Sequence, residues 1–229
     1  MMFILGLFMA SFLNVIAERT VRCEKWFCGR SYCPSCKHTL AWYDLIPVLS
    51  YLLLGGKCRY CKERIPIRYP LSEIVLGIAF YMASRYTHGV YTAFVLFGIS
   101  VAYISALTDI YDGTIYDAFT LPFAFLFIAL RAFFSVTFLF DGLFGMMAGF
   151  LVPYVIVRAT KMAGEGDVTF LTFLGAFLGL NRLIIAVPLS FVIAGIVVTV
   201  LLVMGKANMK SHVPLVPFLF AGTVWSFYL

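Results

Sequence analysis

The sequence predicts an all-α polytopic membrane protein, with about eight transmembrane helices and a small polar loop domain. Of the 229 residues, 62% are hydrophobic and only 12% are charged, and the mean hydropathy is +0.97. Soluble domains average about 45–50% apolar and about 25% charged residues, so a soluble globular protein is excluded. The 24 Phe and 13 Tyr residues also exclude a disordered chain. At about 20 residues a span, the length allows roughly eight helices.

Eight apolar runs mark the expected spans. They cover residues 1–17, 71–86, 90–108, 118–136, 141–158, 168–180, 183–204 and 213–229. The run at 168–180 is short, so it spans only if the bilayer thins locally or if its helix continues past Arg182. Two glycine pairs with four-residue spacing would allow close helix contacts, unless they only reflect how common glycine is in membrane helices. These pairs are Gly145/Gly149 and Gly175/Gly179.

The distribution of basic residues predicts the orientation. If the polar segment 18–70 is cytoplasmic, the loops that hold Arg158/Lys161 and Lys206/Lys210 lie on the same side. That side then holds 14 of the 17 Lys and Arg residues. By the positive-inside rule we expect this side to be cytoplasmic and both termini to be non-cytoplasmic.

The chain is therefore expected to have three parts: a first transmembrane anchor at 1–17, a cytoplasmic cysteine-rich loop at 18–70 and a membrane core at 71–229. The segment 18–70, named the cysteine loop below, has ten Lys and Arg against four Asp and Glu, a net charge of +6. It is suited to a bilayer with an anionic inner leaflet, at about 1 kcal/mol per basic residue near the surface. No nucleic-acid partner is expected.

The cysteine loop contains two C-x2-C pairs separated by 21 residues. The pairs are Cys33/Cys36 and Cys58/Cys61. Two residues between thiolates let both sulfurs reach one tetrahedral ion, and the spacing lies just outside that of four-thiolate zinc sites. We expect one structural Zn²⁺, which would supply much of the loop's folding free energy. Two disulfides or redox-active dithiols are the alternatives, and a cytoplasmic location argues against stable disulfides. Cys23 and Cys28 are not assigned to the site. They could be alternate ligands or free thiols.

Acidic residues in the membrane core need a reason, because a carboxylate near the bilayer centre costs roughly 2.5–3.5 kcal/mol. Asp141 and Glu73 have structural explanations, as the N-cap and the first turn of predicted helices. Asp109 and Asp167 are instead expected to emerge on one face, at similar depth, from separate helices. Two carboxylates that meet across a water-filled cleft can hold one proton between them, which is the arrangement of aspartic peptidases.

The alternative interpretation gives these carboxylates no chemistry. Asp117 and Asp167 would then cap helices, and Asp109 and Asp112 would be solvated loop residues. Spacing alone leaves both interpretations open.

A set of short motifs extends along nearly the whole chain. They are Ser11-Phe12-Leu13-Asn14-Val15, both cysteine pairs, Trp42-Tyr43-Asp44 with Ile46-Pro47, Gly56-Lys57-Cys58-Arg59, Arg68-Tyr69-Pro70 with Glu73, Asp109 with Asp117, and Gly164-x-Gly166-Asp167. This ordered set resembles the type IV prepilin peptidases, a membrane branch of the GxGD aspartic proteases.

The resemblance implies a multi-pass enzyme of the bacterial inner membrane with its active site at the cytoplasmic face. Such enzymes cut the basic leader of prepilins or pseudopilins, in type IV pilus or type II secretion systems, after a glycine and just before the apolar helix. The catalytic pair carries over to Asp109 and Asp167. Members with the cysteine loop commonly also N-methylate the new N-terminus with S-adenosylmethionine. This chain has no glycine-rich nucleotide loop, so that cosubstrate rests on the resemblance alone.

Three positions depart from the family pattern. Tyr116 stands where the family usually has Pro, Ala10 where it has Gly, and Thr169 where it often has Lys. None of the three is a catalytic carboxylate, so peptidase activity is still expected.

A basic leader needs complementary charge, which the basic cysteine loop does not offer. We expect the acidic residues around the catalytic pair to hold it, and the glycines to let the substrate backbone come close. These substrate-binding residues are Asp112, Asp117, Glu165, Gly164 and Gly166. The alternative is that the three acids are ordinary solvated carboxylates.

Two other function classes compete with a peptidase. A zinc-stabilised membrane scaffold or transporter would lack peptidase chemistry, but transporters place carboxylates near the midplane, whereas this pair is expected at one boundary. A membrane dithiol oxidoreductase would need its cysteines near the outer face, and these are expected at the inner one.

Overall fold

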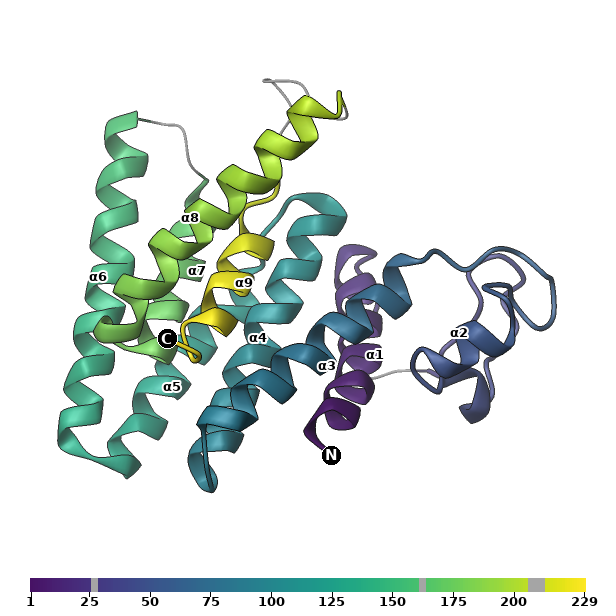
Figure 1. The fold of residues 1–229 in the computed structure, drawn as a ribbon, viewed down its shortest axis with the longest axis horizontal. Helices are drawn as coiled ribbons and strands as arrows, with labels where there is room; N and C mark the ends of the chain where they lie inside the picture. The colour runs from purple at the N-terminus through teal and green to yellow at the C-terminus, as the bar shows by residue number, and fades with distance from the viewer. Residues whose placement is uncertain (26–28, 161–163, 206–212) are drawn as a thin grey trace. The chain divides into compact units, whose positions relative to one another are not determined.

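The computed structural model describes residues 1–25, 29–160, 164–205 and 213–229. In these ranges the regular structure is helical apart from two isolated β-bridges, so the all-α prediction is confirmed (Figure 1). The elements are α1 (Met2–Val21), η1 (Trp42–Leu45), α2 (Leu49–Leu53), α3 (Arg68–Tyr86), α4 (Val90–Asp112), η2 (Asp117–Phe119), α5 (Leu121–Phe134), α6 (Val136–Thr160), α7 (Glu165–Leu178), α8 (Leu180–Val203) and α9 (Val216–Trp225).

Five segments of the described chain are long and apolar enough to cross a bilayer. They are Met2–Val21, Val90–Asp112, Asp117–Phe134, Val136–Ala159 and Leu180–Val203. Many of their apolar side chains are exposed, such as Val155 on α6 and Ile196 on α8. Such broad apolar surface is suited to lipid and not to water. The helices thus indicate a multi-pass membrane protein. The other three predicted spans correspond to α3, α7 and α9.

The chain divides into two compact units, Met1–Leu96 and Phe97–Leu229, so the boundary falls within α4. In the first unit α1 packs against α3. A Cβ atom on Gly6 would lie 2.7 Å from the Cα atom of Gly77, so the two helix backbones are in direct contact. The side chain of Asn14, buried in this interface, donates to the hydroxyl of Ser72 at 3.0 Å.

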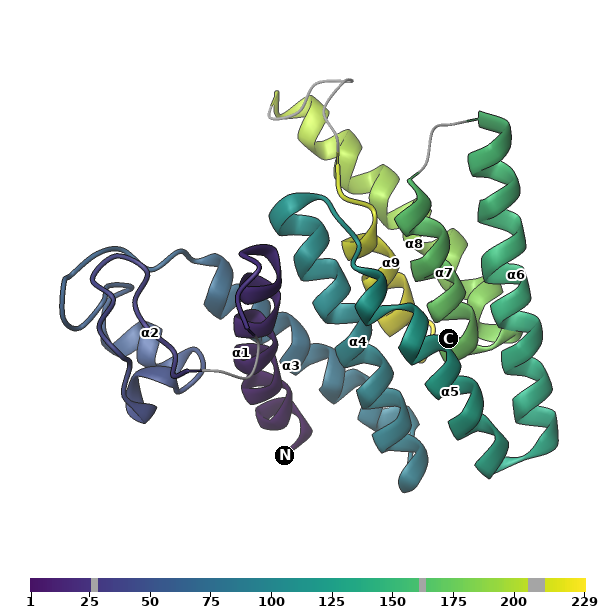
Figure 2. The same cartoon turned by 180° about the vertical axis from the view of Figure 1, so that it is seen from behind.

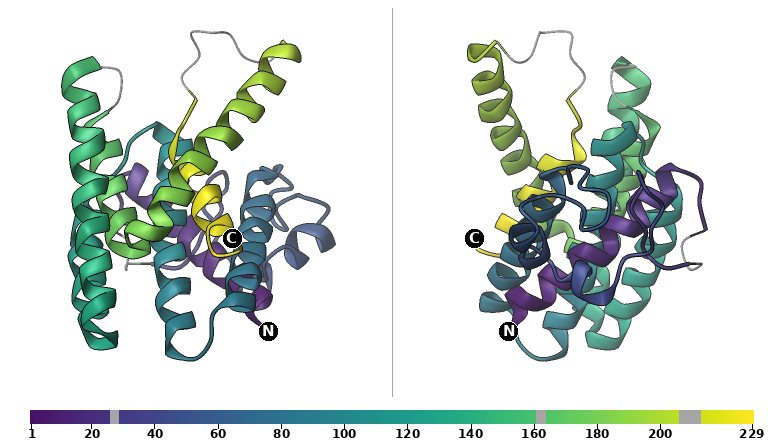
Figure 3. Two further views of the ribbon diagram at one scale, coloured as in Figure 1. Left: turned by 60° about the vertical axis from the view of Figure 1, so that its left-hand side comes forward. Right: turned by 90° about the vertical axis from the view of Figure 1, so that its right-hand side faces the viewer.

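The second unit contains most of α4 (residues 97–112), η2 and α5 to α9. Figure 2 shows α5 and α7 side by side. Figure 3 shows α6 and α8 close at one end and diverging toward the other, with the shorter α7 and α9 beside them. A Cβ atom on Gly145 or Gly175 would collide with backbone of the facing helix. The prediction that these glycines allow close helix contact is therefore confirmed, with α6 and α7 as the contacting helices.

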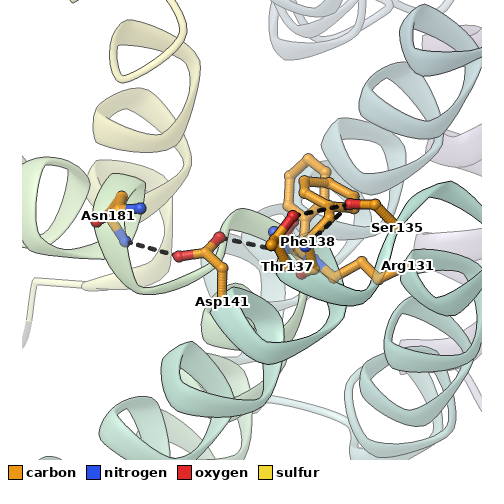
Figure 4. A network of polar contacts seen from close by, with 7 residues as sticks. Arg131, Ser135, Thr137, Phe138, Asp141 and Asn181 are labelled. Atoms are coloured by element: carbon orange, nitrogen blue, oxygen red, sulfur yellow. Dashed lines mark hydrogen bonds and ion pairs between the residues drawn. The ribbon is translucent and has the colours of Figure 1, made fainter.

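A buried arginine fixes the end of α7. Arg131 on α5 is only 1% exposed and donates to the carbonyls of Phe138 at 2.7 Å and Phe177 at 2.9 Å. It also pairs with Asp141 at 3.1 Å. Figure 4 shows the Asp141 carboxylate between Asn181 and the turn from α5 to α6, and the Asn181 N–H donates to it at 3.3 Å.

This network corrects two expectations. Asp141 is not an N-cap, because it lies inside α6 and neutralises a buried guanidinium. The helix at 168–180 does not continue past Arg182, because α7 ends at Leu178 and Gly179 adopts φ +80° before α8 begins. That left-handed conformation is accessible to glycine, and a Cβ atom at Gly179 would collide with the carboxylate of Asp141.

Candidate functional site

The two cysteine pairs have the same backbone conformation. In each, the N–H of the first cysteine donates to the carbonyl five residues on, at 3.0 Å for Cys33 and 2.8 Å for Cys58. The residue after each pair, Lys37 or Lys62, has a φ near +60° (59° and 63°) and donates its N–H back to the carbonyl of that first cysteine at 2.8 and 3.0 Å. The two turns, which we name the cysteine knuckles, are thus related by a shift of 25 residues along the chain.

The knuckles bring four sulfur atoms together. The Sγ atoms of Cys33, Cys36, Cys58 and Cys61 lie within 4.8 Å of one another, and those of Cys33 and Cys61 are 3.8 Å apart. A tetrahedral ion with metal–sulfur distances of about 2.3 Å would set neighbouring sulfurs ~3.8 Å apart. No disulfide links the cysteines in the described ranges. The donor set and its spacing therefore fit one four-coordinate metal ion.

The thiol pKa values show how the four groups affect one another. Burial raises the pKa of Cys33, but N–H groups of Cys36 and Ser35 and neighbouring thiols oppose it and lower the pKa to about 7. For Cys61 the N–H of Glu63 lowers the pKa, but burial and the other three thiols raise it to about 12. The thiol of Cys33 thus loses its proton readily, whereas the thiol of Cys61 keeps its proton, because a second thiolate beside the first would be repelled. A bound cation would allow all four to ionise.

The remaining two cysteines are separate from this cluster. Cys23 follows α1 and is exposed, with φ 56°. Cys28 lies outside the described residues.

Asp109 lies in the last turn of α4, and its carboxylate reaches the start of another helix. Its Oδ2 accepts a hydrogen bond of 3.0 Å from the N–H of Val216, the first residue of α9. Residue 109 is 9% exposed. A helix N-terminus carries a partial positive charge and stabilises a carboxylate in this position. Pro217 marks the start of α9 in the sequence, because proline is favourable in the first turn of a helix, but it does not indicate that Asp109 lies there.

Asp167 lies in the first turn of α7 and hydrogen-bonds to Gly164, the residue that precedes this helix. Its Oδ2 accepts from the Gly164 N–H at 3.1 Å, and its own N–H donates to the Gly164 carbonyl at 3.2 Å. The residue is half-buried. Asp109 and Asp167 thus lie in the same unit, at the end of α4 and the start of α7.

Gly166 has a packing role beside this pair. A Cβ atom at Gly166 would lie 2.9 Å from the Cβ atom of Ile115, in the segment that follows α4. Glycine lets this segment lie against the start of α7, which joins the ends of the helices that carry the two aspartates. Gly164 differs, because its Cβ atom would meet Asp167 at 3.8 Å, an ordinary contact. Packing thus requires glycine at 166 but not at 164.

The predicted leader-binding acids are all exposed. Asp112 holds its own loop, because its carboxylate accepts from the Thr114 N–H at 3.0 Å and from the Tyr116 hydroxyl at 2.7 Å. Asp117 begins η2 and Glu165 begins α7.

An apolar cavity of about 390 Å³ lies beside Asp167. Its walls come from α6, α7, α8 and Leu215, next to the residue that binds Asp109. Asp167 is the one charged residue among the described residues that line it. Sequence reasoning missed this cavity, because its walls combine side chains of three successive helices with Leu215, and the way these helices pack is not visible in the sequence.

Glu73 also differs from its expected role. It lies in the second turn of α3, not the first. Its Oε2 accepts from the N–H of Val48 at 2.8 Å.

Comparison with known proteins gives matches over most of the chain. The model of the bacterial peptidase A24 N-terminal domain matches residues 4–86, and that of the type IV leader peptidase family matches residues 96–200. No solved structure gives a significant match.

Several curated relatives carry the name prepilin leader peptidase/N-methyltransferase. The one from Myxococcus xanthus is 35% identical over 92% of this chain and 65% of its own length. Those from Burkholderia pseudomallei and Bacillus subtilis are both 30% identical, over 96% and 99% of this chain and 81% and 92% of their own lengths. The chain thus spans slightly less than two thirds of the Myxococcus protein.

Proposed function

Because the chain belongs to the type IV leader peptidase family and is thus an enzyme of the prepilin peptidase type, we propose that it is a membrane aspartic endopeptidase. It cleaves the leader of prepilins or pseudopilins after a glycine, with Asp109 and Asp167 as the catalytic pair. The observation that supports this proposal is that Gly166, next to Asp167, packs against Ile115, six residues after Asp109, so that the end of α4 adjoins the start of α7.

The chemistry requires one ionised and one protonated carboxyl group. The carboxylate takes a proton from water as the water oxygen attacks the scissile carbonyl carbon. The protonated partner gives its proton to the amide nitrogen as the carbon–nitrogen bond breaks. Each carboxyl group is fixed by one backbone N–H, from Val216 or Gly164. These bonds hold the pair in place without a basic side chain, which would favour ionisation of both.

The apolar cavity beside Asp167 supports a substrate whose cleavage site adjoins an apolar helix. A peptide bond placed at the pair would have its next residue at the mouth of this cavity, where only Asp167 is charged. Burial of an apolar side chain there would contribute about 1.5–3 kcal/mol to binding.

For the membrane arrangement we propose eight spans, with α3, α7 and α9 in addition to the five long segments. The enzyme lies in the bacterial inner membrane, with the cysteine loop and the active site at the cytoplasmic face and both termini on the other. Residues 1–17 serve as an anchor, 18–70 as the zinc-binding loop and 71–229 as the peptidase core. The 14 of 17 basic residues on the proposed cytoplasmic side support this orientation.

For the metal we propose a structural Zn²⁺ held by Cys33, Cys36, Cys58 and Cys61. The relatives' names also include an N-methyltransferase, so we propose that this chain methylates the new N-terminus. S-adenosylmethionine would supply the methyl group to the free amine.

One experiment tests the proposal against a scaffold, a transporter or an oxidoreductase. Detergent-purified protein is incubated with a prepilin, with and without S-adenosylmethionine, and product masses are read. We expect a mass loss equal to the leader, plus a gain of one methyl group when the cosubstrate is present. An intact prepilin would contradict the proposal, and Asp109→Asn should give that same intact product.

A further inference from the structure

A second cavity lies in the first unit, and none of the residues assigned to peptide cleavage is among its lining residues. Its volume is about 270 Å³, just below the roughly 300–1,000 Å³ of usual small-molecule sites. Its walls come from α1, α3, the segment around η1 and α2, and both cysteine knuckles. Polar groups line it, including Ser11, Asn14 and Tyr51.

Four carboxylates line this cavity, and Glu73 is the buried one without an ion pair in the described ranges. It is 7% exposed, and its hydrogen bonds come from the Val48 N–H and the Ser11 hydroxyl. Of the other acids on the wall, Glu18 accepts from Arg68, Asp44 pairs with Arg59 at 2.8 Å, and Glu63 is exposed. None of the ion pairs within the described ranges includes Glu73. A buried charge of this kind is costly unless a cation compensates it.

The backbone that contacts Glu73 is strained. Val48 has φ 59° and ψ −48°, and the Leu49 N–H closes a three-residue turn on the Pro47 carbonyl at 2.5 Å. A β-branched residue with positive φ is an outlier, and the tight turn of this hand is rare. The turn directs the Val48 N–H toward the Glu73 carboxylate, and this hydrogen bond holds the carboxylate at the cavity wall.

We propose that this cavity binds S-adenosylmethionine, with its sulfonium group next to the carboxylate of Glu73. This inference rests on the proposed methyl transfer and gives it a location. The sulfonium is a compact cation that compensates Glu73, and the hydroxyl and amide groups of the wall suit a sugar and a base. Because the knuckles form part of the wall, the proposal also explains what a metal centre contributes to this enzyme. It keeps the methyl-donor cavity in shape.

The test measures binding and not turnover. Isothermal titration of the zinc-loaded protein is done with S-adenosylmethionine and with S-adenosylhomocysteine, which has a neutral thioether. Glu73→Gln keeps an acceptor for Val48 and removes only the charge. We expect it to weaken S-adenosylmethionine binding at least tenfold and S-adenosylhomocysteine binding much less. Val15→Phe, which fills the cavity without a charge change, should weaken both ligands equally.

The control is Glu24→Gln, since Glu24 lines a smaller neighbouring hollow. It should bind both ligands as the unmodified protein does. The inference is overturned if unmodified protein methylates its product but Glu73→Gln and Val15→Phe bind both ligands with unchanged affinity. If Glu73→Gln loses zinc or aggregates, Val15→Phe decides alone. Unmodified protein that cleaves but neither methylates nor binds the donor refutes the methyl-transfer part of the proposed function, whereas failure to cleave refutes the peptidase part.

Discussion

At the scale of single residues, the catalytic proposal depends on two aspartates that act as a unit. Asp109→Asn and Asp167→Asn should each abolish cleavage, and the double variant should be no worse than either single one, because one shared proton is lost in all three. Activity of the unmodified enzyme should follow a bell-shaped pH profile that belongs to the pair. Cleavage rates over pH 4–9 check both points. A single Asn variant with near-normal cleavage would remove that residue from the pair.

Charge recognition is also decided by single residues. Glu165→Gln should raise KM for a basic leader and flatten its salt dependence, because opposite charges attract less strongly when one is removed or screened. It is a cleaner test than Asp112→Asn, which also breaks the hydrogen bonds that hold residues 112–116. The comparison is a leader without basic residues, which should be unaffected. Equal effects on both leaders would mean that Glu165 shapes the site without recognising charge.

At the scale of elements, the cysteine knuckles depend on their metal. Replacing any of Cys33, Cys36, Cys58 or Cys61 by Ser should lower zinc content and impair methylation more than cleavage, because the Asp pair lies in the other unit. Acidification should release the metal, since protons compete for the thiolates. Elemental analysis across pH checks this. Cys23→Ser is the control, because Cys23 is outside the cluster, and zinc loss in that variant would contradict the ligand assignment.

The junction of α7 and α8 gives a stability prediction. Gly179→Ala should destabilise the protein by about 1–3 kcal/mol, because φ +80° with ψ 170° lies in a backbone region that is essentially restricted to glycine, with a further loss from the collision with Asp141. Gly195→Ala in α8 is the matched control, because nothing lies within 4 Å of its Cβ position. It should be neutral or stabilising. Thermal unfolding in detergent measures both, and equal melting temperatures would contradict the packing argument.

At the scale of the whole molecule, the sequence predicted what depends on local pattern. Apolar runs located the helices, and the C-x2-C spacing located the four clustered thiols. It did not predict what depends on contacts between distant segments. Asp141 was expected to cap a helix and instead neutralises Arg131 across two helices. The end of α7 follows from that same contact, and no local signal distinguishes Gly179 from other membrane glycines.

The candidate sites divide in the same way. The motif that contains Asp167 is visible in sequence, but the partner of Asp109 is a backbone N–H 107 residues away. Likewise Glu73 was expected to interact with the first turn of its own helix, whereas its hydrogen-bond partner lies 25 residues earlier in the chain. Composition and periodicity carry no information about such pairings.

The 25-residue relation between the knuckles has a consequence for how this part of the chain can diverge. Each knuckle is closed by hydrogen bonds between near neighbours in sequence, so the conformation of each ligand pair is determined by its own short segment. The stretch between the two knuckles, with η1 and α2, is an insert whose two ends are held together by the knuckles. Each doubling of such an insert costs only about 0.6 kcal/mol in closure entropy. A longer insert would therefore cost little free energy, as long as the turn that presents the Val48 N–H is kept. Because Val48 lies in this stretch, the segment between the two knuckles is also the part of the loop that reaches Glu73.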